Sequence, residues 1–164
     1  MRPTQLIVNL NSIKKNINEI KNYLESNINI MPIVKSFAYG THLHCCPDIL
    51  NEFEYVGVAY LDEAIELRKN GYKNNILILY PLSKEEFEES KKYNFILNGS
   101  NIFDIIDNHT KVRVHTEIET GMGRTGLQLS NINEYISNLN NNNNVILEGI
   151  FTHLSTNTFI FEVL

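Results

Sequence analysis

Short apolar runs alternate with segments of helical periodicity along this chain, and this alternation limits the folds that it can adopt. Runs typical of buried strands lie at 30–35, 55–60, 76–80, 95–97, 112–118 and 145–151, after a short extended start at 6–8. Strands joined by helical segments pair in parallel through right-handed crossovers. We therefore expect an α/β fold. Periodicity leaves open whether it is a doubly wound open sheet or a portion of a barrel, because a complete barrel needs about 250 residues and the chain has 164.

The segments between these runs predict helices with recognisable ends. Asn11 or Ser12 can cap a first helix, and Ser83 with Glu86 forms a capping-box pattern for a later one. Gly71 is typical of the residue that ends a helix, here the helix expected from position 61. Another helix is expected at 100–106, and the asparagine run at 140–144 is expected to be a solvated loop.

Composition excludes several classes of partner. Lys and Arg total 14 against 19 Asp and Glu, a formal net charge of −5, so a basic face for nucleic acid or anionic lipid is not expected. No apolar stretch approaches the roughly 20 residues of a membrane span, and the N-terminus has no signal-peptide pattern. We expect a cytoplasmic protein.

Two histidines and two cysteines are close together in one segment. His42 and His44 precede the adjacent pair Cys45 and Cys46. Neighbouring cysteines rarely bridge each other, and this spacing does not match structural zinc sites. We expect reduced thiols and no metal.

Lys35 lies at the end of the apolar run 30–35. The carboxyl ends of parallel strands are where α/β proteins build their sites, and partial burial favours the neutral, nucleophilic amine. A lysine whose side chain extends to solvent is the alternative, and spacing alone favours it.

The segment Met31-Pro-Ile-Val-Lys35-Ser-Phe-Ala-Tyr39-Gly40 closely resembles the lysine motif of alanine racemases, V-V-K-A-D-A-Y-G-H-G. The resemblance implies that Lys35 binds pyridoxal phosphate (PLP) covalently and serves as a catalytic base. It also implies that Tyr39 contacts the cofactor phosphate. After Gly40 the family's His-Gly is replaced by Thr-His-Leu-His.

A second segment, residues 112–126, resembles the family segment V-H-L-K-I-D-T-G-M-G-R-L-G-F. The resemblance implies that Arg124 contacts the cofactor's phenolic oxygen and the substrate carboxylate, as suits a permanently charged guanidinium. Many members have a carbamylated lysine at position 117, and Glu117 would supply a carboxylate without that modification. We expect Glu117 to pair with Arg124.

The same loop matches the pattern G-x-G-x-x-G at Gly121, Gly123 and Gly126. A dinucleotide site would also need an acidic residue about 20 positions later, where Glu148 is only roughly placed. This alternative gives Lys35 no role.

Two further segments extend the resemblance. Residues 57–68 resemble the block A-V-A-T-L-E-E-A-x-x-L-R, and residues 148–155 resemble E-G-L-M-T-H-F-A, which implies that His153 lies beside the cofactor ring. The resemblance runs from Pro3 to about Ser155. We expect one domain at 1–155, an incomplete barrel that binds PLP, and a divergent tail at 156–164.

The chain is thus identified as similar to the N-terminal barrel portion of the alanine racemase family, a parallel-stranded partial TIM barrel. The resemblance implies a PLP-dependent isomerase that interconverts L- and D-alanine for cell-wall synthesis, and a dimer. The family's later strands and its opposite-face tyrosine base have no counterpart in these 164 residues. The expected partners are an amino-acid substrate and either further copies of the chain or a missing C-terminal half. A non-catalytic PLP-binding protein and a serine racemase remain alternatives.

Overall fold

The computed structural model describes residues 4–107 and 109–156, and its centre is a parallel sheet of five strands in the order β1-β2-β3-β4-β5. The strands are Tyr55–Val58, Asn75–Ile78, Ile96–Asn98, Val112–Glu117 and Val145–Phe151. Consecutive strands are neighbours throughout, as in a barrel wall and unlike a doubly wound sheet, whose order reverses. The fold is the parallel-stranded partial barrel that the family resemblance implies.

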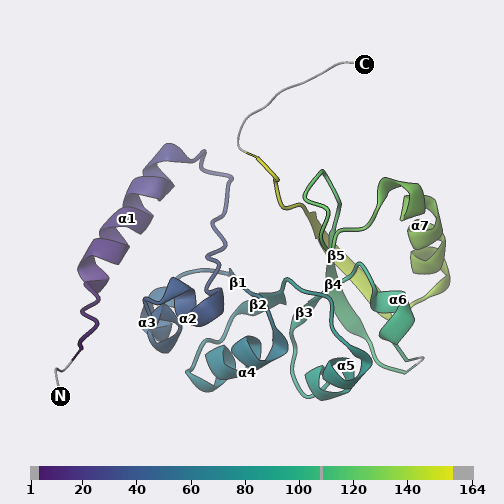
Figure 1. The fold of residues 1–164 in the computed structure, drawn as a ribbon, viewed down its shortest axis with the longest axis horizontal. Helices are drawn as coiled ribbons and strands as arrows, with labels where there is room; N and C mark the ends of the chain where they lie inside the picture. Colours follow the sequence, from purple (N-terminus) through teal and green to yellow (C-terminus); the bar gives the residue numbers. More distant parts are fainter. Residues whose placement is uncertain (1–3, 108, 157–164) are drawn as a thin grey trace.

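Helices α1 Leu10–Tyr23, α2 Lys35–Tyr39 and α3 Pro47–Leu50 precede β1, with a single 3-10 turn at Leu43–Cys45. Helices α4 Leu61–Lys69, α5 Lys84–Ser90, α6 Ile102–Ile105 and α7 Ile132–Asn141 connect the strands and follow one another around one side of the sheet, with a second 3-10 turn at Leu129–Asn131 (Figure 1). The capping box predicted at Ser83 and Glu86 is present at the start of α5. Beyond α4, Gly71 has a φ of +98°, a value that glycine tolerates without strain.

The core lies between the helices and the sheet face that they cover. Val56 and Val58 on β1 and Ile76 and Ile78 on β2 alternate toward this face and are almost fully buried. They pack with the buried side chains of α4 and α5: Leu61, Ala64, Leu67 and Phe87. The packing of the helices fixes the sheet and therefore the positions at which its strands end.

Three expectations about local structure are wrong. The run 30–35 forms only an isolated bridge between Ile33 and Gly57, because the chain leaves the sheet at Val34. The cap of α1 is Asn9, whose side chain accepts from two backbone amides, and not Asn11 or Ser12. The run 140–144 is not entirely loop, since α7 continues to Asn141. Residues 6–8 lie outside any regular element.

Apolar side chains remain exposed at both ends of this partial barrel, on α1 and on β5. α1 has one apolar side but no buried residue, and Figure 1 shows it standing apart from the sheet. At the opposite side, Ile146, Leu147 and Ile150 of β5 are 42–70% exposed. Among the described residues, β5 pairs on one side alone. In this part of the chain no helix is long and apolar enough to cross a bilayer.

Candidate functional site

The carboxyl ends of the strands gather polar and aromatic side chains at one rim of the sheet. Lys35 follows the bridge at Ile33, and Tyr60 and Tyr80 follow β1 and β2. Asn98 and Glu117 are the last residues of β3 and β4. Because all of these strands are parallel, residues that follow their carboxyl ends lie on the same rim.

Lys35 opens a turn of unusual backbone conformation. Ser36, Phe37, Ala38 and Tyr39 all have φ between +50° and +55°, although none of them is glycine. For L-residues this left-handed conformation costs roughly 1–2 kcal/mol each. Surrounding contacts must therefore hold it, and strain of this kind is typical of functional sites.

The carboxylate of Glu63 is one of these contacts. Its Oε1 accepts a hydrogen bond of 2.6 Å from the Ser36 amide, directly after Lys35. Its Oε2 accepts from the amides of Ala59 and Tyr60 at 2.7 and 3.2 Å. One side chain from α4 thus joins the lysine turn to the end of β1. Within the turn, the Ala38 amide donates to Val34 O at 3.0 Å, and Ala38 is buried.

The loop that presents Arg124 is organised by a second carboxylate. Glu119 accepts hydrogen bonds from the amides of Gly121, Gly123 and Arg124 at 2.5, 2.8 and 3.2 Å. The amides of Gly123 and Gly121, in that order, hold the pKa of Glu119 below its ordinary value. The loop closes where the Leu127 amide donates to Glu117 O at 2.7 Å.

The ion pair expected between Glu117 and Arg124 is present. Arg124 Nη2 lies 3.3 Å from Glu117 Oε1, and the glutamate is 2% exposed. Thr125 Oγ1 donates to Glu117 Oε2 at 2.6 Å, and Asn98 Nδ2 lies 3.4 Å from the same oxygen. The buried carboxylate is therefore held on several sides, and it directs the arginine toward the rim.

Tyr39 and His153, the other two residues expected at the site, lie apart from the ion pair. Tyr39 ends the left-handed turn and is 66% exposed, and His153 is exposed just after β5. Neither makes a hydrogen bond or ring contact with Lys35 or Arg124 within the described residues. The structure thus brings Glu117 and Arg124 together, and it places Lys35 on the same rim.

Sequence reasoning missed Glu63, Glu119 and Tyr80. Glu63 had a signal, since a glutamate at the third position of a helix can accept from the backbone before that helix. Glu119 also had one, as a carboxylate two residues before a glycine can accept from a turn. Tyr80, whose ring lies 5.3 Å from the Arg124 guanidinium carbon, had none.

The glycine loop does not have the geometry of a dinucleotide site. The amides that would face a phosphate already donate to the carboxylate of Glu119. Glu148 Oε1 lies 2.8 Å from Arg113 Nε, so this carboxylate is engaged in an ion pair and is not free to accept from a ribose hydroxyl. Burial lowers the pKa of His115, whose charge also interacts with Glu148 and Arg113.

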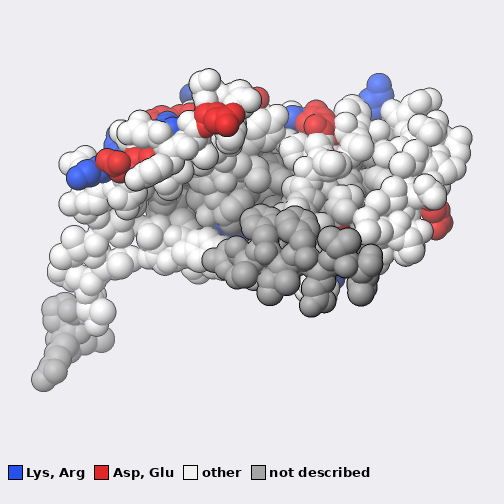
Figure 2. All heavy atoms as spheres, turned by 90° about the horizontal axis from the view of Figure 1, so that it is seen from above, with Lys and Arg blue, Asp and Glu red and all other residues white. Residues whose placement is uncertain are grey.

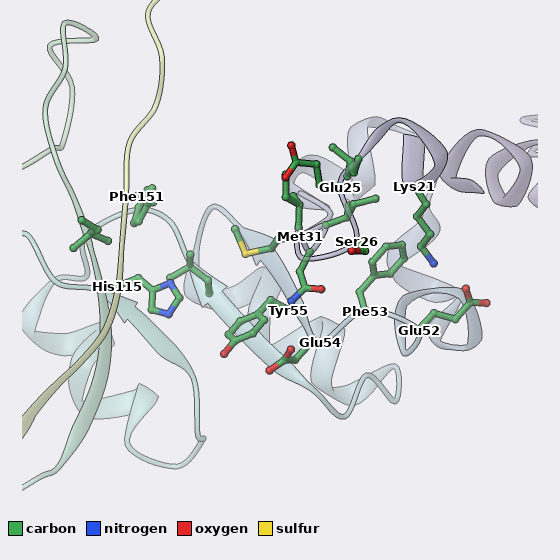
Figure 3. A pocket seen from close by; sticks show the side chains of 16 residues that line it. Lys21, Glu25, Ser26, Met31, Glu52, Phe53, Glu54, Tyr55, His115 and Phe151 are labelled. Carbon is green, nitrogen blue, oxygen red and sulfur yellow. The ribbon is translucent and has the colours of Figure 1, made fainter. Parts of the chain in front are cut away.

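A cavity of about 630 Å³ opens on the inner side of the sheet, away from these residues. Figure 3 shows His115 and Phe151 on one side and Met31, Tyr55 and Phe53 on the other. Lys35, Glu117 and Arg124 do not line it. Figure 2 shows charged side chains gathered mainly along one edge of the face in view. The cavity is a consequence of the uncovered inner face and is not the candidate site.

Comparison with known proteins gives a consistent result. The family model described as "Alanine racemase, N-terminal domain" matches residues 8–158. Alanine racemase 1 of Caldanaerobacter subterraneus subsp. tengcongensis is 30% identical over 94% of this chain and 42% of its own length. Alanine racemase of Streptococcus pneumoniae is 32% identical over 94% of this chain and 44% of its own.

Solved structures agree in fold. Alanine racemase of Clostridium difficile 630, in complex with cycloserine, superposes with a TM-score of 0.82 at 34% identity, over 91% of this chain and 44% of that one. Alanine racemase from E.faecalis superposes with a TM-score of 0.77 at 26% identity, over 91% of this chain and 43% of that one. The chain spans less than half the length of the relatives it matches.

Proposed function

This chain belongs to the family of the alanine racemase N-terminal domain, and we propose that it forms the N-terminal barrel portion of a PLP-dependent alanine racemase. One observation carries the proposal: the buried Glu117 directs Arg124 toward the same rim on which Lys35 begins its strained turn. A nucleophilic amine and a fixed guanidinium on one rim suit an anionic aldehyde and an amino-acid carboxylate.

The side chains of the rim fit the cofactor in chemical type. Lys35 offers an amine, Arg124 a guanidinium with N–H donors beyond the one that meets Glu117, and Tyr39 an exposed hydroxyl. When bound, PLP withdraws electrons from the α-carbon of an amino acid, so that its proton becomes removable. We propose that Lys35 Nζ holds the cofactor and then moves this proton on one face.

The other residues bind and orient. We propose that Tyr39 meets the cofactor phosphate, and that Arg124 meets the phenolic oxygen and the substrate carboxylate. Glu117 keeps Arg124 directed toward the rim, and His153 is proposed to lie beside the cofactor ring. Racemisation also needs a proton delivered on the opposite face. We infer that this second base belongs to the part of the relatives' length that this chain does not span.

The exposed apolar edge of β5 indicates what covers this domain. Within the described residues the outer edge of β5 is unpaired, and such an edge, beside the exposed Ile146 and Leu147, is a template for a further strand. We propose that residues 1–155 form a PLP-binding domain completed by a C-terminal half, in the same or another polypeptide, and that the assembly is a dimer. The tail proposed at 156–164 lies, from residue 157, outside the described residues. The role proposed is cytoplasmic supply of D-alanine for the cell wall, with serine as the alternative substrate.

The proposal is tested by measuring D-alanine formation from L-alanine and PLP. We expect little turnover by the chain alone and restored turnover when a racemase C-terminal half is added in trans. Lys35→Ala added with the same half is the control and should be inactive. No D-alanine from the reconstituted pair would contradict the enzyme assignment.

A non-catalytic PLP-binding protein is the second candidate, favoured by an amine at Lys35 without an opposite-face base in these 164 residues. It predicts saturable PLP binding that depends on Lys35, with no turnover even after addition of the C-terminal half. The same experiment therefore separates the two functions.

A further inference from the structure

Two aromatic side chains stand on the rim between Lys35 and Arg124, and neither has a role in the function proposed above. Tyr60 and Tyr80 follow β1 and β2, and their ring centroids are 5.1 Å apart. Tyr60 is 51% exposed, and Tyr80 is half-buried. The backbone amide of Tyr80 donates to Ala59 O at 3.1 Å, which fixes the start of its side chain.

The ring of Tyr80 faces the functional guanidinium. Arg124 Cζ lies 5.3 Å from the centroid of Tyr80, within the range in which the face of an aromatic ring attracts a cation. On another side the same guanidinium meets Glu117 Oε1 at 3.3 Å. Two contacts from the ends of two different strands, β2 and β4, therefore restrict one long side chain.

These contacts are complementary. Glu117 engages one nitrogen by a charge-assisted hydrogen bond and leaves the guanidinium free to swing about that nitrogen. A ring beneath the guanidinium plane opposes this swing without using any N–H donor. Within the described residues, the other donors of Arg124 thus stay available to an anionic oxygen.

We propose that Tyr80 is a positioning residue of this site, which holds the Arg124 guanidinium in place for an anionic group of the cofactor or substrate. The proposal deepens the proposed function and rests on it for the identity of the ligand. The phenol hydroxyl has no part in it, because the face of the ring makes the contact. A phenylalanine should therefore serve as well as the tyrosine, and a leucine should not.

The test measures PLP affinity by absorbance titration of the 164-residue chain and its variants. We expect Tyr80→Leu to weaken binding about two- to fivefold, the size of an exposed cation–π contact. Tyr80→Phe should bind as the parent chain does. In an Arg124→Ala background, Tyr80→Leu should have no further effect, because Tyr80 acts through the arginine. A loss that persists in that background, or Tyr80→Leu binding like the parent chain, would overturn the proposal.

A matched control and a second measurement separate this proposal from the proposed function. Tyr93 is also half-buried and stacked on a ring, Phe95 at 5.0 Å, but it precedes β3 at the other end of the sheet. Tyr93→Leu should leave PLP affinity unchanged. The four proteins of the Tyr80 and Arg124 cycle are also unfolded in denaturant without PLP. If the shifts in denaturation midpoint caused by the two single substitutions add up to that of the double variant, the positioning role is overturned. Absence of PLP binding by the parent chain would contradict only the proposed function.

Discussion

Glu63 accepts a hydrogen bond of 2.6 Å from the backbone amide of Ser36, across 27 positions of the sequence. The same carboxylate accepts from the amides of Ala59 and Tyr60, so it joins the turn that follows Lys35 to the end of β1. The turn is strained at four successive residues, and the strain persists because contacts such as this one oppose its release.

Removal of this carboxylate should release the turn. We expect Glu63→Ala to lower the free energy of unfolding by about 1–3 kcal/mol, because three backbone amides lose a charged acceptor. The amide hydrogen of Ser36 should exchange faster, and by more than the loss of global stability alone would cause. Glu89→Ala, an exposed glutamate on α5, is the control and should change neither quantity. Unaltered exchange at Ser36 would show that the turn is held by other contacts.

The loop that presents Arg124 should loosen in acid. The backbone amides of Gly123 and Gly121 lower the pKa of Glu119 in the folded chain below its ordinary value of 4.5. A group with a depressed folded pKa contributes stability fully above its unfolded pKa and loses it as pH falls through the folded pKa. The amide resonances of Gly121 and Gly123 should therefore shift together below pH 4.5, with a midpoint under that value. Glu119→Gln should abolish this shift, and a midpoint at or above the ordinary pKa of a glutamate would contradict the assignment.

Gly126 should be irreplaceable for a steric reason. A Cβ at this position would lie 2.6 Å from the nitrogen of Glu119 and 2.9 Å from the carbonyl carbon of Ile118, both of them backbone atoms. We expect Gly126→Ala to cost about 1–3 kcal/mol of unfolding free energy, as overpacking does. Gly123 has open space and a φ of +67°, which asparagine tolerates. Gly123→Asn in the same loop should be the milder change in thermal unfolding, and equal losses would argue against the steric explanation.

The sequence predicted those parts of the molecule that depend on local pattern. The apolar run at 112–118 became β4 at Val112–Glu117, because alternate side chains of a strand must find a buried face. The pairing of Glu117 with Arg124 was predicted from the resemblance to the alanine racemase family, in which a carboxylate at this position orients the arginine, and the structure contains it.

The sequence could not predict what depends on distant contacts. Nothing in Ser36 to Tyr39 signals a left-handed turn, because the usual residue for positive φ is glycine and none stands there. The run 30–35 pairs with the sheet only at Ile33, and the chain leaves the sheet at Val34, where it enters the turn that Glu63 of α4 holds. The contact of Tyr80 with Arg124 joins the ends of β2 and β4, which only the assembled sheet brings together.

The most direct test of the site is whether PLP labels Lys35 and no other lysine. The Lys35 amine would attack the aldehyde carbon, forming a carbon–nitrogen double bond as water leaves, and borohydride would then add hydride to make the bond permanent. Lys35 begins a turn fixed by Glu63 and lies on the rim that Arg124 faces. Lys14 and Lys84 are exposed on helices and have no such neighbours among the described residues. Peptide mapping after reduction should recover the label at 35, with loss of the label in Lys35→Ala and weaker labelling in Arg124→Ala. Label spread over surface lysines, or unchanged by Lys35→Ala, would remove the basis for a cofactor site at this rim.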